Sequence, residues 1–468
     1  MIAGPRPLAI AALACSLLAA AVRLPRLQAP GLAEAEQAAF VESQGFSAHA
    51  ALPAPAPFTA DALPRRTGVL DAARHATVPP LQAAGLALWT RAAGTSEAAL
   101  RLPSALAGAL AAGLAALVAG GLAGTAAAAW AGAFVALSPI FTLASREAVP
   151  EAPLVLLLLA ALALFVRVAQ SGRPGTAAAL GLALGLLGSA GVAAFAAVAA
   201  VPLLSLAHRP DRRAAAAWTG AAALGAVAGL AFLGLARSPA DFGEVPGWIP
   251  AASLSGIVRC TGASFTRIAG LEYHLAVSHA RSVIPLTALV AGLMAWGASR
   301  LPRWARGAFV AGAVLPFAVG AVLALSMGRV LPLQATRLVA ALPFVAVLLG
   351  AGLGSLRGWR AGAAGTAVAG VLAGFLALAL ARPDYETSPT RAVAREVARC
   401  GAGDTVIALR RPLDLLAFVA WDVPGPFVLR PARDPVPEGP AIVVGASSTC
   451  VSGGAACGVF PACLSGHP

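Results

Sequence analysis

The chain has 468 residues, of which 59% are hydrophobic and 11% are charged, and its mean hydropathy is +0.81. This average excludes an ordinary soluble protein, because most of such a chain must lie in lipid. The formal charge of +13 does not indicate a nucleic-acid partner, because the arginines form short clusters between apolar runs, where signals for membrane orientation belong.

Apolar runs of roughly 16 to 23 residues recur along the chain, and each is about long enough to cross a bilayer. The first begins near the N-terminus without a clear small-residue cleavage site, so we expect an uncleaved helix rather than a signal peptide. The sequence therefore predicts eleven membrane spans. The expected spans are 8–24, 103–122, 125–142, 152–168, 175–190, 191–207, 214–236, 282–299, 306–326, 335–354 and 361–381.

The arginine clusters set the orientation of these spans. One further apolar run, 78–89, is short, and if it does not cross, four arginine-rich connections face the cytoplasm, as the positive-inside rule requires. We therefore expect a juxtamembrane or re-entrant helix at 78–89, with the N-terminus inside and the C-terminus outside. The four connections are RVAQSGRPG (167–175), HRPDRR (208–213), SRLPRWARG (299–307) and LRGWRAG (356–362).

The loop 25–102 then lies outside, and it is too long to be a mere connector. It contains LAEAEQAAFVESQGF (32–46), which places three carboxylates, Glu34, Glu36 and Glu42, in a chain with few charges. A structural interpretation is an amphipathic helix that lies on the membrane with a solvated acidic face. The functional interpretation is an acidic segment that takes part in catalysis.

Four segments in this order carry a resemblance to a known family. They are GLAEAEQAAFVE (31–42), PPL (79–81) followed by GTSEAALRLPSAL (94–106), LSPIFTLASREAVPEAPL (137–154) and ATRLVAALPFVAVLLGAGL (335–353). Over residues 1–385 the chain resembles the GT-C fold glycosyltransferases that use polyprenyl-phosphate sugars, the protein O-mannosyltransferase and aminoarabinose transferase-like group.

The resemblance implies an all-α polytopic membrane protein of the inner (plasma) membrane, with its active site facing the periplasm or exterior. Such an enzyme transfers a sugar from a polyprenyl-phosphate-linked donor to a lipid, glycan or protein acceptor. It contacts membrane lipids and no nucleic acid.

The resemblance also implies roles for particular residues. Glu34 or Glu36 corresponds to the glutamate of the family's Asp-Glu pair and would act as the general base, with Glu151 as an acidic partner. Arginines would stabilise the negative charge on the leaving lipid phosphate. Side chains that merely reach toward lipid headgroups are the alternative for these arginines. The candidate phosphate contacts are Arg146, Arg329 and Arg337.

A divalent metal ion is a further possibility on the outer side, although the spacing of its candidate ligands is not that of a known metal motif. Ordinary loop histidines are the alternative. The candidate ligands are His75, Glu272, His274 and His279.

The sequence departs from the family pattern at several positions. Ala33 stands at the aspartate of the Asp-Glu pair, and Val78 stands where a basic residue usually precedes PPL. GSAG (188–191) replaces a region that often contains a lysine, and Glu151 occupies a position that is often Asp. These differences are compatible with an unusual acceptor or with a relative that has lost activity.

The tail, 382–468, has the composition of a soluble domain, and we expect it to form a small extracytoplasmic α/β domain after the membrane domain 1–381. PTRAVAREVARC (389–400) predicts an amphipathic helix. The predicted strands are 404–410, 426–431 and 441–445.

Four of the six cysteines lie in this tail. In an oxidising compartment they could form two disulfides, with three possible pairings, and a zinc site is the alternative. Cys15 and Cys260 are expected to be unpaired. The tail cysteines are Cys400, Cys450, Cys457 and Cys463.

A non-enzymatic transporter or scaffold is the competing hypothesis. Transporters place charged groups and broken helices near the middle of their spans. The spans of this chain are nearly free of charge, and the acidic residues lie at one face of the membrane by the predicted topology. This distribution favours chemistry on a lipid-borne substrate at the membrane surface.

Overall fold

The computed structural model describes a little over half of the chain, in separate segments. The described residues are 5–25, 27–28, 32–46, 63, 65, 68–69, 79–171, 179–180, 183, 187, 252–269, 280–328, 338–357, 359–381, 387–388, 406–409, 412–421, 423, 426–429, 441–444 and 449–452. The chain divides into two compact units: unit 1 comprises 1–27, 101–235 and 244–383, and unit 2 comprises 28–100, 236–243 and 384–468.

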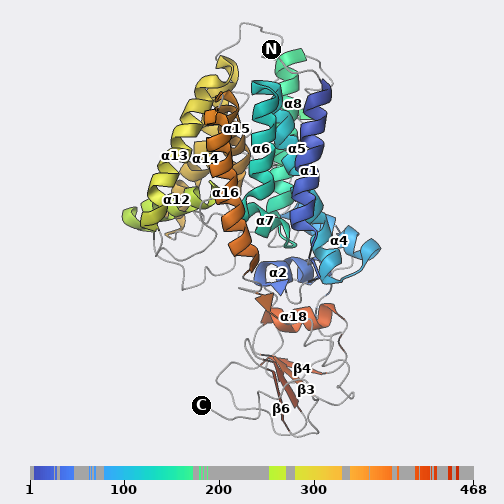
Figure 1. Ribbon diagram of the computed structural model, residues 1–468. Helices are drawn as coiled ribbons and strands as arrows, with labels where there is room; N and C mark the ends of the chain where they lie inside the picture. The colour runs from blue at the N-terminus through green and yellow to red at the C-terminus, as the bar shows by residue number, and fades with distance from the viewer. Residues whose placement is uncertain are drawn as a thin grey trace. The chain divides into compact units, whose positions relative to one another are not determined.

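Unit 1 is built from helices (Figure 1). The helices are α1 (Pro5–Arg23), α5 (Glu97–Ala123), whose first residues belong to unit 2, α6 (Thr125–Leu137), α7 (Pro139–Ser145), α8 (Glu151–Ser171), α12 (Leu254–Ile268), α13 (Ala280–Arg300), α14 (Arg303–Met327), the 3₁₀ turn η5 (Val339–Ala341), α15 (Leu342–Ser355) and α16 (Trp359–Ala381). Four helices in the described part of the chain, α1, α5, α8 and α14, are long and apolar enough to cross a membrane.

The prediction of a polytopic membrane protein is therefore confirmed in its coarse form. The expected spans 191–207 and 214–236 lie outside the described residues, as does most of 175–190. The segment predicted as a non-spanning helix forms α4 (Pro80–Ala93), which has 14 residues. At 1.5 Å per residue it is about 21 Å long, shorter than the roughly 30 Å apolar core of a bilayer.

The expected span 125–142 is not one straight helix. It divides into α6 and α7, which are bent by 60° at Ser138. The cause lies in the sequence, because Pro139 has no N–H to continue the helical hydrogen bonds and its ring clashes with the preceding turn. If the bent pair counts as one span, the described residues contain five candidate spans.

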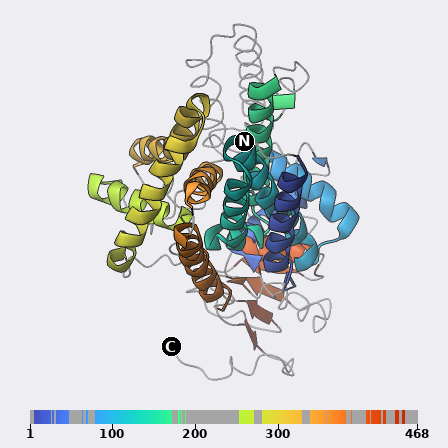
Figure 2. The ribbon, with the colours of Figure 1, turned by 45° about the horizontal axis from the view of Figure 1, so that its top comes forward.

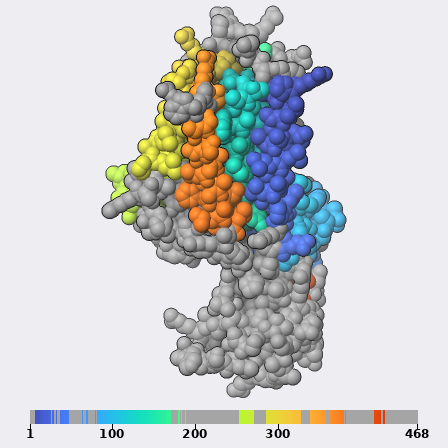
Figure 3. Space-filling model, viewed as in Figure 1, coloured from blue at the N-terminus to red at the C-terminus, as the bar shows by residue number. Residues whose placement is uncertain are grey.

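Helix α15 is the core of unit 1, since every residue from Leu342 to Leu353 is buried. It packs against α6 and α13, and Figures 1 and 2 both show it between these helices. In the space-filling view, α1, α6 and the orange helices of residues 342–381 form adjacent ridges on one face (Figure 3). Contact between such helices in lipid depends on close van der Waals packing, because lipid tails provide no hydrophobic drive.

Glycines allow this close approach. A Cβ at Gly350 would lie 2.6 Å from the backbone oxygen of Ala127 in α6. On the other side of α15, Gly352 faces Gly297 of α13, and a Cβ at Gly297 would lie 2.8 Å from the backbone nitrogen of Gly352. The high glycine content of the chain is thus used at particular helix crossings.

Unit 2 combines most of the loop 25–102 with the tail. Its elements are β1 (Leu32–Ala33), α2 (Glu34–Ser43), α4, β2 (Thr387–Ser388), β3 (Val406–Leu409), α18 (Pro412–Ala420), β4 (Phe427–Leu429), β5 (Ala441–Val444) and β6 (Thr449–Ser452). The tail strands form one sheet in the order β4-β3-β5-β6, in which β3 is parallel to both β4 and β5.

Strands β3, β4 and β5 fall within the three segments predicted as strands. Helix α18 and strand β6 were not predicted; α18 provides the crossover that two parallel strands require. The predicted helix 389–400 lies outside the described residues, as do Cys400, Cys457 and Cys463. Cys15 and Cys260 are free, as expected.

The packing of α13 on α15 predicts a difference between two glycines of the same helix. Gly297→Ala should destabilise the protein by about 1–3 kcal/mol, because the added methyl group overpacks the crossing. The measurement is the midpoint of thermal unfolding of the purified protein in detergent.

Gly292→Ala is the matched control, since nothing lies within 4 Å of a Cβ at that position. It should leave the midpoint unchanged or raise it, because alanine favours a helix more than glycine does. Equal midpoints for the two variants would contradict the observed crossing.

Candidate active site

The bend between α6 and α7 leaves backbone groups without helical partners at one end of unit 1. Arg23, the last residue of α1, occupies the bend. Its Nη2 donates to the carbonyl oxygen of Val135 at 2.9 Å and its Nη1 to that of Ala136 at 2.8 Å. The carbonyl of Val135 is the one that would have accepted from residue 139, where Pro139 has no N–H to give. Arg23 therefore satisfies the groups that the proline releases.

Arg23 is completely buried. Its Nε donates to Ser145 Oγ at 2.7 Å, and its guanidinium lies over the ring of Phe141, 5.2 Å from the ring centre. Gly108 of α5 makes room for this arrangement, because a Cβ there would lie 2.8 Å from Arg23 Nε and 2.6 Å from Ser145 Cβ. One arginine thus fastens α1 to both halves of the bent helix.

The two sequence segments 94–106 and 137–154 meet at this same end. Ser104 Oγ donates to the carbonyl oxygen of Val149 at 3.3 Å. Both segments also reach the chain that follows α1. Arg101 Nη1 donates to the carbonyl oxygen of Leu27 at 3.3 Å, and Arg146 Nη2 donates to that of Pro25 at 3.0 Å.

We call this cluster the polar end of unit 1. It is defined by Arg23, Arg101, Ser104, Ser145, Arg146 and Glu151. Its three arginines differ in exposure: Arg23 and Arg101 are buried, whereas Arg146 is half-exposed. Glu151 begins α8 and is half-buried. An exposed guanidinium can bind an anion such as a phosphate, whereas Arg23 and Arg101 donate to backbone carbonyls of the fold.

Sequence reasoning identified Arg146 and Glu151 and missed Arg23 and Arg101. A usable signal was present. An arginine at the end of an apolar span is costly in lipid unless it has partners inside the protein. Arg101 also lies within RLPSAL, one of the segments that carry the family resemblance.

The acidic residues Glu34, Glu36 and Glu42 of the loop 25–102 belong to unit 2. Glu34 is the first residue of α2. Glu36 is completely buried and Glu42 is 1% exposed, so the interpretation of this segment as a helix with a solvated acidic face is wrong for these two residues. The reason is tertiary packing, because α2 contacts both α4 and α18. Sequence periodicity could not show this, since the partner α18 comes from the far end of the chain.

The remaining expected site residues cannot be placed. Arg329, Arg337, His75, Glu272, His274 and His279 all lie outside the described residues. Among the residues that are described, no group of three or more His, Cys, Asp or Glu side chains could hold a metal ion.

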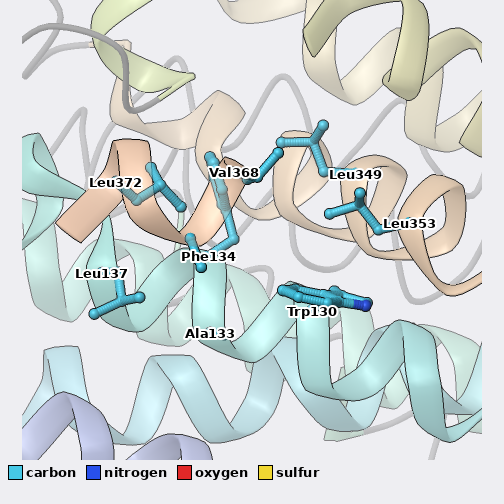
Figure 4. Close-up of a pocket in the computed structure, with 9 residues that line it drawn as sticks. Trp130, Ala133, Phe134, Leu137, Leu349, Leu353, Val368 and Leu372 are labelled. Carbon is cyan, nitrogen blue, oxygen red and sulfur yellow. The ribbon is translucent and has the colours of Figure 1, made fainter. Parts of the chain in front are cut away.

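Unit 1 also contains an apolar pocket between α6, α15 and α16 (Figure 4). Trp130 and Phe134 of α6 face Leu349 and Leu353 of α15 across it. Its lining has no acid, base or cation, so it offers space for hydrocarbon rather than for chemistry. Its lining residues are Trp130, Ala133, Phe134, Leu137, Leu349, Leu353, Val368, Ala369 and Leu372.

Comparison with known proteins gives one family and several solved structures. Residues 77–234 match the family described as dolichyl-phosphate-mannose-protein mannosyltransferase. No curated protein matches the chain. The crystal structure of ArnT from Cupriavidus metallidurans in the apo state is similar with a TM-score of 0.59 and 15% identity, covering 89% of this chain and 85% of that one.

Two further solved structures have bound lipid phosphates. ArnT from Cupriavidus metallidurans bound to undecaprenyl phosphate gives a TM-score of 0.50 at 16% identity, over 88% of this chain and 74% of that one. The archaeal oligosaccharyltransferase AglB from Archaeoglobus fulgidus, in complex with an inhibitory peptide and a dolichol-phosphate, gives 0.50 at 12% identity, over 89% and 64%. At these identities the likeness shows a shared fold.

The bonding of Arg23 predicts a large effect of its removal. Arg23→Met should leave the carbonyl of Val135 buried and unsatisfied, which costs about 1–3 kcal/mol. It should also remove the shorter of two hydrogen bonds to the carbonyl of Ala136, which accepts a second one from Thr142 Oγ1 at 3.4 Å. The midpoint of thermal unfolding in detergent should fall accordingly.

Arg6→Met on the same helix is the control, because Arg6 is exposed at the opposite end of α1. It should have little effect. A variant at position 23 that unfolds at the wild-type temperature would show that the arginine does not hold the bend.

Proposed function

We propose that this chain, a membrane glycosyltransferase with the GT-C fold, transfers a sugar from a polyprenyl-phosphate donor to an acceptor on the extracytoplasmic side of the membrane. The observation that carries the proposal is that the family match over 77–234 contains Arg101, Arg146 and Glu151, which belong to the polar end. The segment that matches the mannosyltransferase family thus supplies every member of this polar cluster except Arg23.

The solved structures of similar fold support a lipid-phosphate donor. One was obtained with undecaprenyl phosphate, and another with a dolichol-phosphate and an inhibitory peptide. By analogy we propose a polyprenyl phosphate as the carrier and a lipid, glycan or protein as the acceptor.

The chemistry assigns a task to each kind of residue. The acceptor hydroxyl or amine attacks the anomeric carbon, the bond from that carbon to the phosphate oxygen breaks, and the phosphate leaves with the negative charge. A carboxylate removes the acceptor proton as the new bond forms. We assign this role to Glu34 or Glu36, with Glu151 as an acidic partner.

The leaving phosphate needs a positive charge close to the position where its negative charge develops. Arg146 is suited to this, because its guanidinium is half-exposed and one nitrogen is held by the carbonyl of Pro25. Arg329 and Arg337 keep the same proposed role from the sequence. No step above depends on a metal ion. The candidate ligands for a divalent metal ion, from the sequence, stay His75, Glu272, His274 and His279.

We also propose the location. The polar end, the loop 25–102 and the tail domain 382–468 lie on the outer, non-cytoplasmic side of the inner (plasma) membrane. The support comes from the arginine-rich connections that face the other side by the positive-inside rule.

The function is tested with purified protein and a panel of labelled polyprenyl-phosphate sugars, by following hydrolysis or transfer of the label. Glu34→Gln should lower the rate of transfer about 10² to 10⁴-fold, as expected for loss of a general base, while donor binding persists. Glu151→Gln should also slow transfer.

Glu36→Gln separates the two carboxylates of α2. Two residues apart on a helix, they point about 200° away from each other, so only one is expected to face a substrate. Because Glu36 is buried, its substitution should change stability more than the rate. If Glu36→Gln abolishes transfer and Glu34→Gln does not, the base is Glu36. Wild-type rates in Glu34→Gln, Glu36→Gln and Glu151→Gln would rule out the mechanism.

The location is tested by thiol labelling in whole cells, or in cells with a permeabilised outer membrane. A cysteine introduced at Ser47 should react with a membrane-impermeant reagent, whereas one in 208–213 should be protected. Both are introduced into a cysteine-free background. Protection at 47 together with labelling at 208–213 would invert the orientation.

A further inference from the structure

The segment that carries the candidate base is paired with the tail. Strand β1 is antiparallel to β2, with Leu32 opposite Ser388 and Ala33 opposite Thr387. Helix α2 begins at the next residue, Glu34. The direction in which α2 leaves β1 is therefore set by a strand from the far end of the chain.

A second contact from the tail lies farther along α2. Helix α18 packs against α2, and Trp421, directly after α18, stacks on Phe40 with the ring centres 5.1 Å apart and the planes at 24°. Phe40 is completely buried. The backbone N–H of Trp421 is itself held, since it donates to the carbonyl oxygen of Ala417 at 3.0 Å. The backbone of the residue that stacks on Phe40 is thus bonded to the last turn of α18.

The other end of α2 is tied within the loop. Gln44 Nε2 donates to Thr90 Oγ1 of α4 at 3.1 Å. Arg65 Nε donates to the carbonyl oxygen of Gln44 at 3.2 Å, and the Arg65 guanidinium lies over the ring of Phe46. Among these contacts, the loop provides those just after α2, and the tail provides the strand pairing directly before Glu34 and the stacking on Phe40.

Helix α2 needs such attachments. It has 10 residues, and an isolated helix of fewer than about 12–15 residues is marginal in water. The position of α2 therefore depends on its packing. This matters for catalysis because a general base must lie within hydrogen-bond reach of the proton that it removes. A displacement of about 1 Å can cost on the order of 10²-fold in rate.

We propose that β2, α18 and Trp421 of the tail position the candidate base, with Trp421 as the main positioning residue. The tail is then a required part of the catalytic machinery rather than an appendage, although Trp421 itself acts through Phe40 and α2. This inference rests on the proposed function of the carboxylates of α2, and it adds a role for a part of the chain outside the family match.

The first test is Trp421→Ala in the full-length protein. We expect kcat to fall roughly 10 to 100-fold with KM for the donor little changed, because the lost alignment matters in the transition state. Trp421→Phe keeps a ring to stack on Phe40 and should recover most of the rate. Trp296→Ala is the matched control, since Trp296 is 45% exposed on α13 and should transfer at the wild-type rate.

A double variant separates positioning from general loss of structure. If Trp421 acts through Glu34, then Trp421→Ala should add little to the loss already caused by Glu34→Gln. Wild-type kcat in Trp421→Ala overturns the inference. The inference is also overturned if Trp421→Ala slows the Glu34→Gln enzyme and the wild type by the same factor. The effect of Trp421 would then be independent of the base.

The last test adds a readout that does not depend on activity. Residues opposite each other in antiparallel strands have Cα atoms about 4.5–5.5 Å apart, within the range that a disulfide spans. Ala33→Cys with Thr387→Cys should form a cross-link under a mild oxidant, detected by mass spectrometry of the joined peptides, and the cross-linked enzyme should still transfer sugar.

These outcomes distinguish the two proposals. Wild-type protein that transfers from no donor defeats the proposed function and the positioning role together. An active wild type without the cross-link, or with a cross-link that abolishes transfer, overturns the positioning role and leaves the glycosyltransferase assignment standing.

Discussion

The arrangement of unit 1 depends on the hydrogen bonds between Arg23 and the carbonyls at the bend of α6 and α7. A bent helix is unfavourable where the released backbone groups are buried and water cannot satisfy them. A buried guanidinium is equally unfavourable alone. The hydrogen bonds between Arg23 and these carbonyls satisfy both the guanidinium and the released backbone groups. Arg23 also donates to Ser145, the last residue of α7, and Arg146 is the next residue. The cation assigned to the lipid phosphate therefore takes its place from a structural arginine.

A related constraint acts at the helix crossings. Lipid provides no hydrophobic driving force between helices, so their association depends on surfaces that pack closely. Gly350 and Gly352 on α15 serve two different neighbours, α6 and α13, and Gly108 on α5 leaves space for the arginine at the bend. In a chain this rich in alanine and glycine, the positions of the few larger and charged side chains determine which helices pack together.

Much of this could be read from the sequence, and the reasons for success and failure are physical. Apolar runs and PPL are local signals, so helices such as α5, α8 and α14 were predicted near their observed positions. The bend at Pro139 is also local and could have been read from the proline. The burial of Glu36 and the stacking of Phe40 on Trp421 depend on residues far apart in the chain, and no local pattern contains them.

The pairing of β1 with β2 has a consequence for how the protein is made. Synthesis runs from the N-terminus, so Leu32 leaves the ribosome long before Ser388, its partner in the pair. Until that late segment emerges, α2 lacks its attachments to the tail, and contacts between such distant residues form slowly. In a nascent chain whose membrane helices are already inserted, α2 would still lack its contacts with β2 and α18. The tail contacts of α2 would form only after Ser388 and Trp421 have been synthesised.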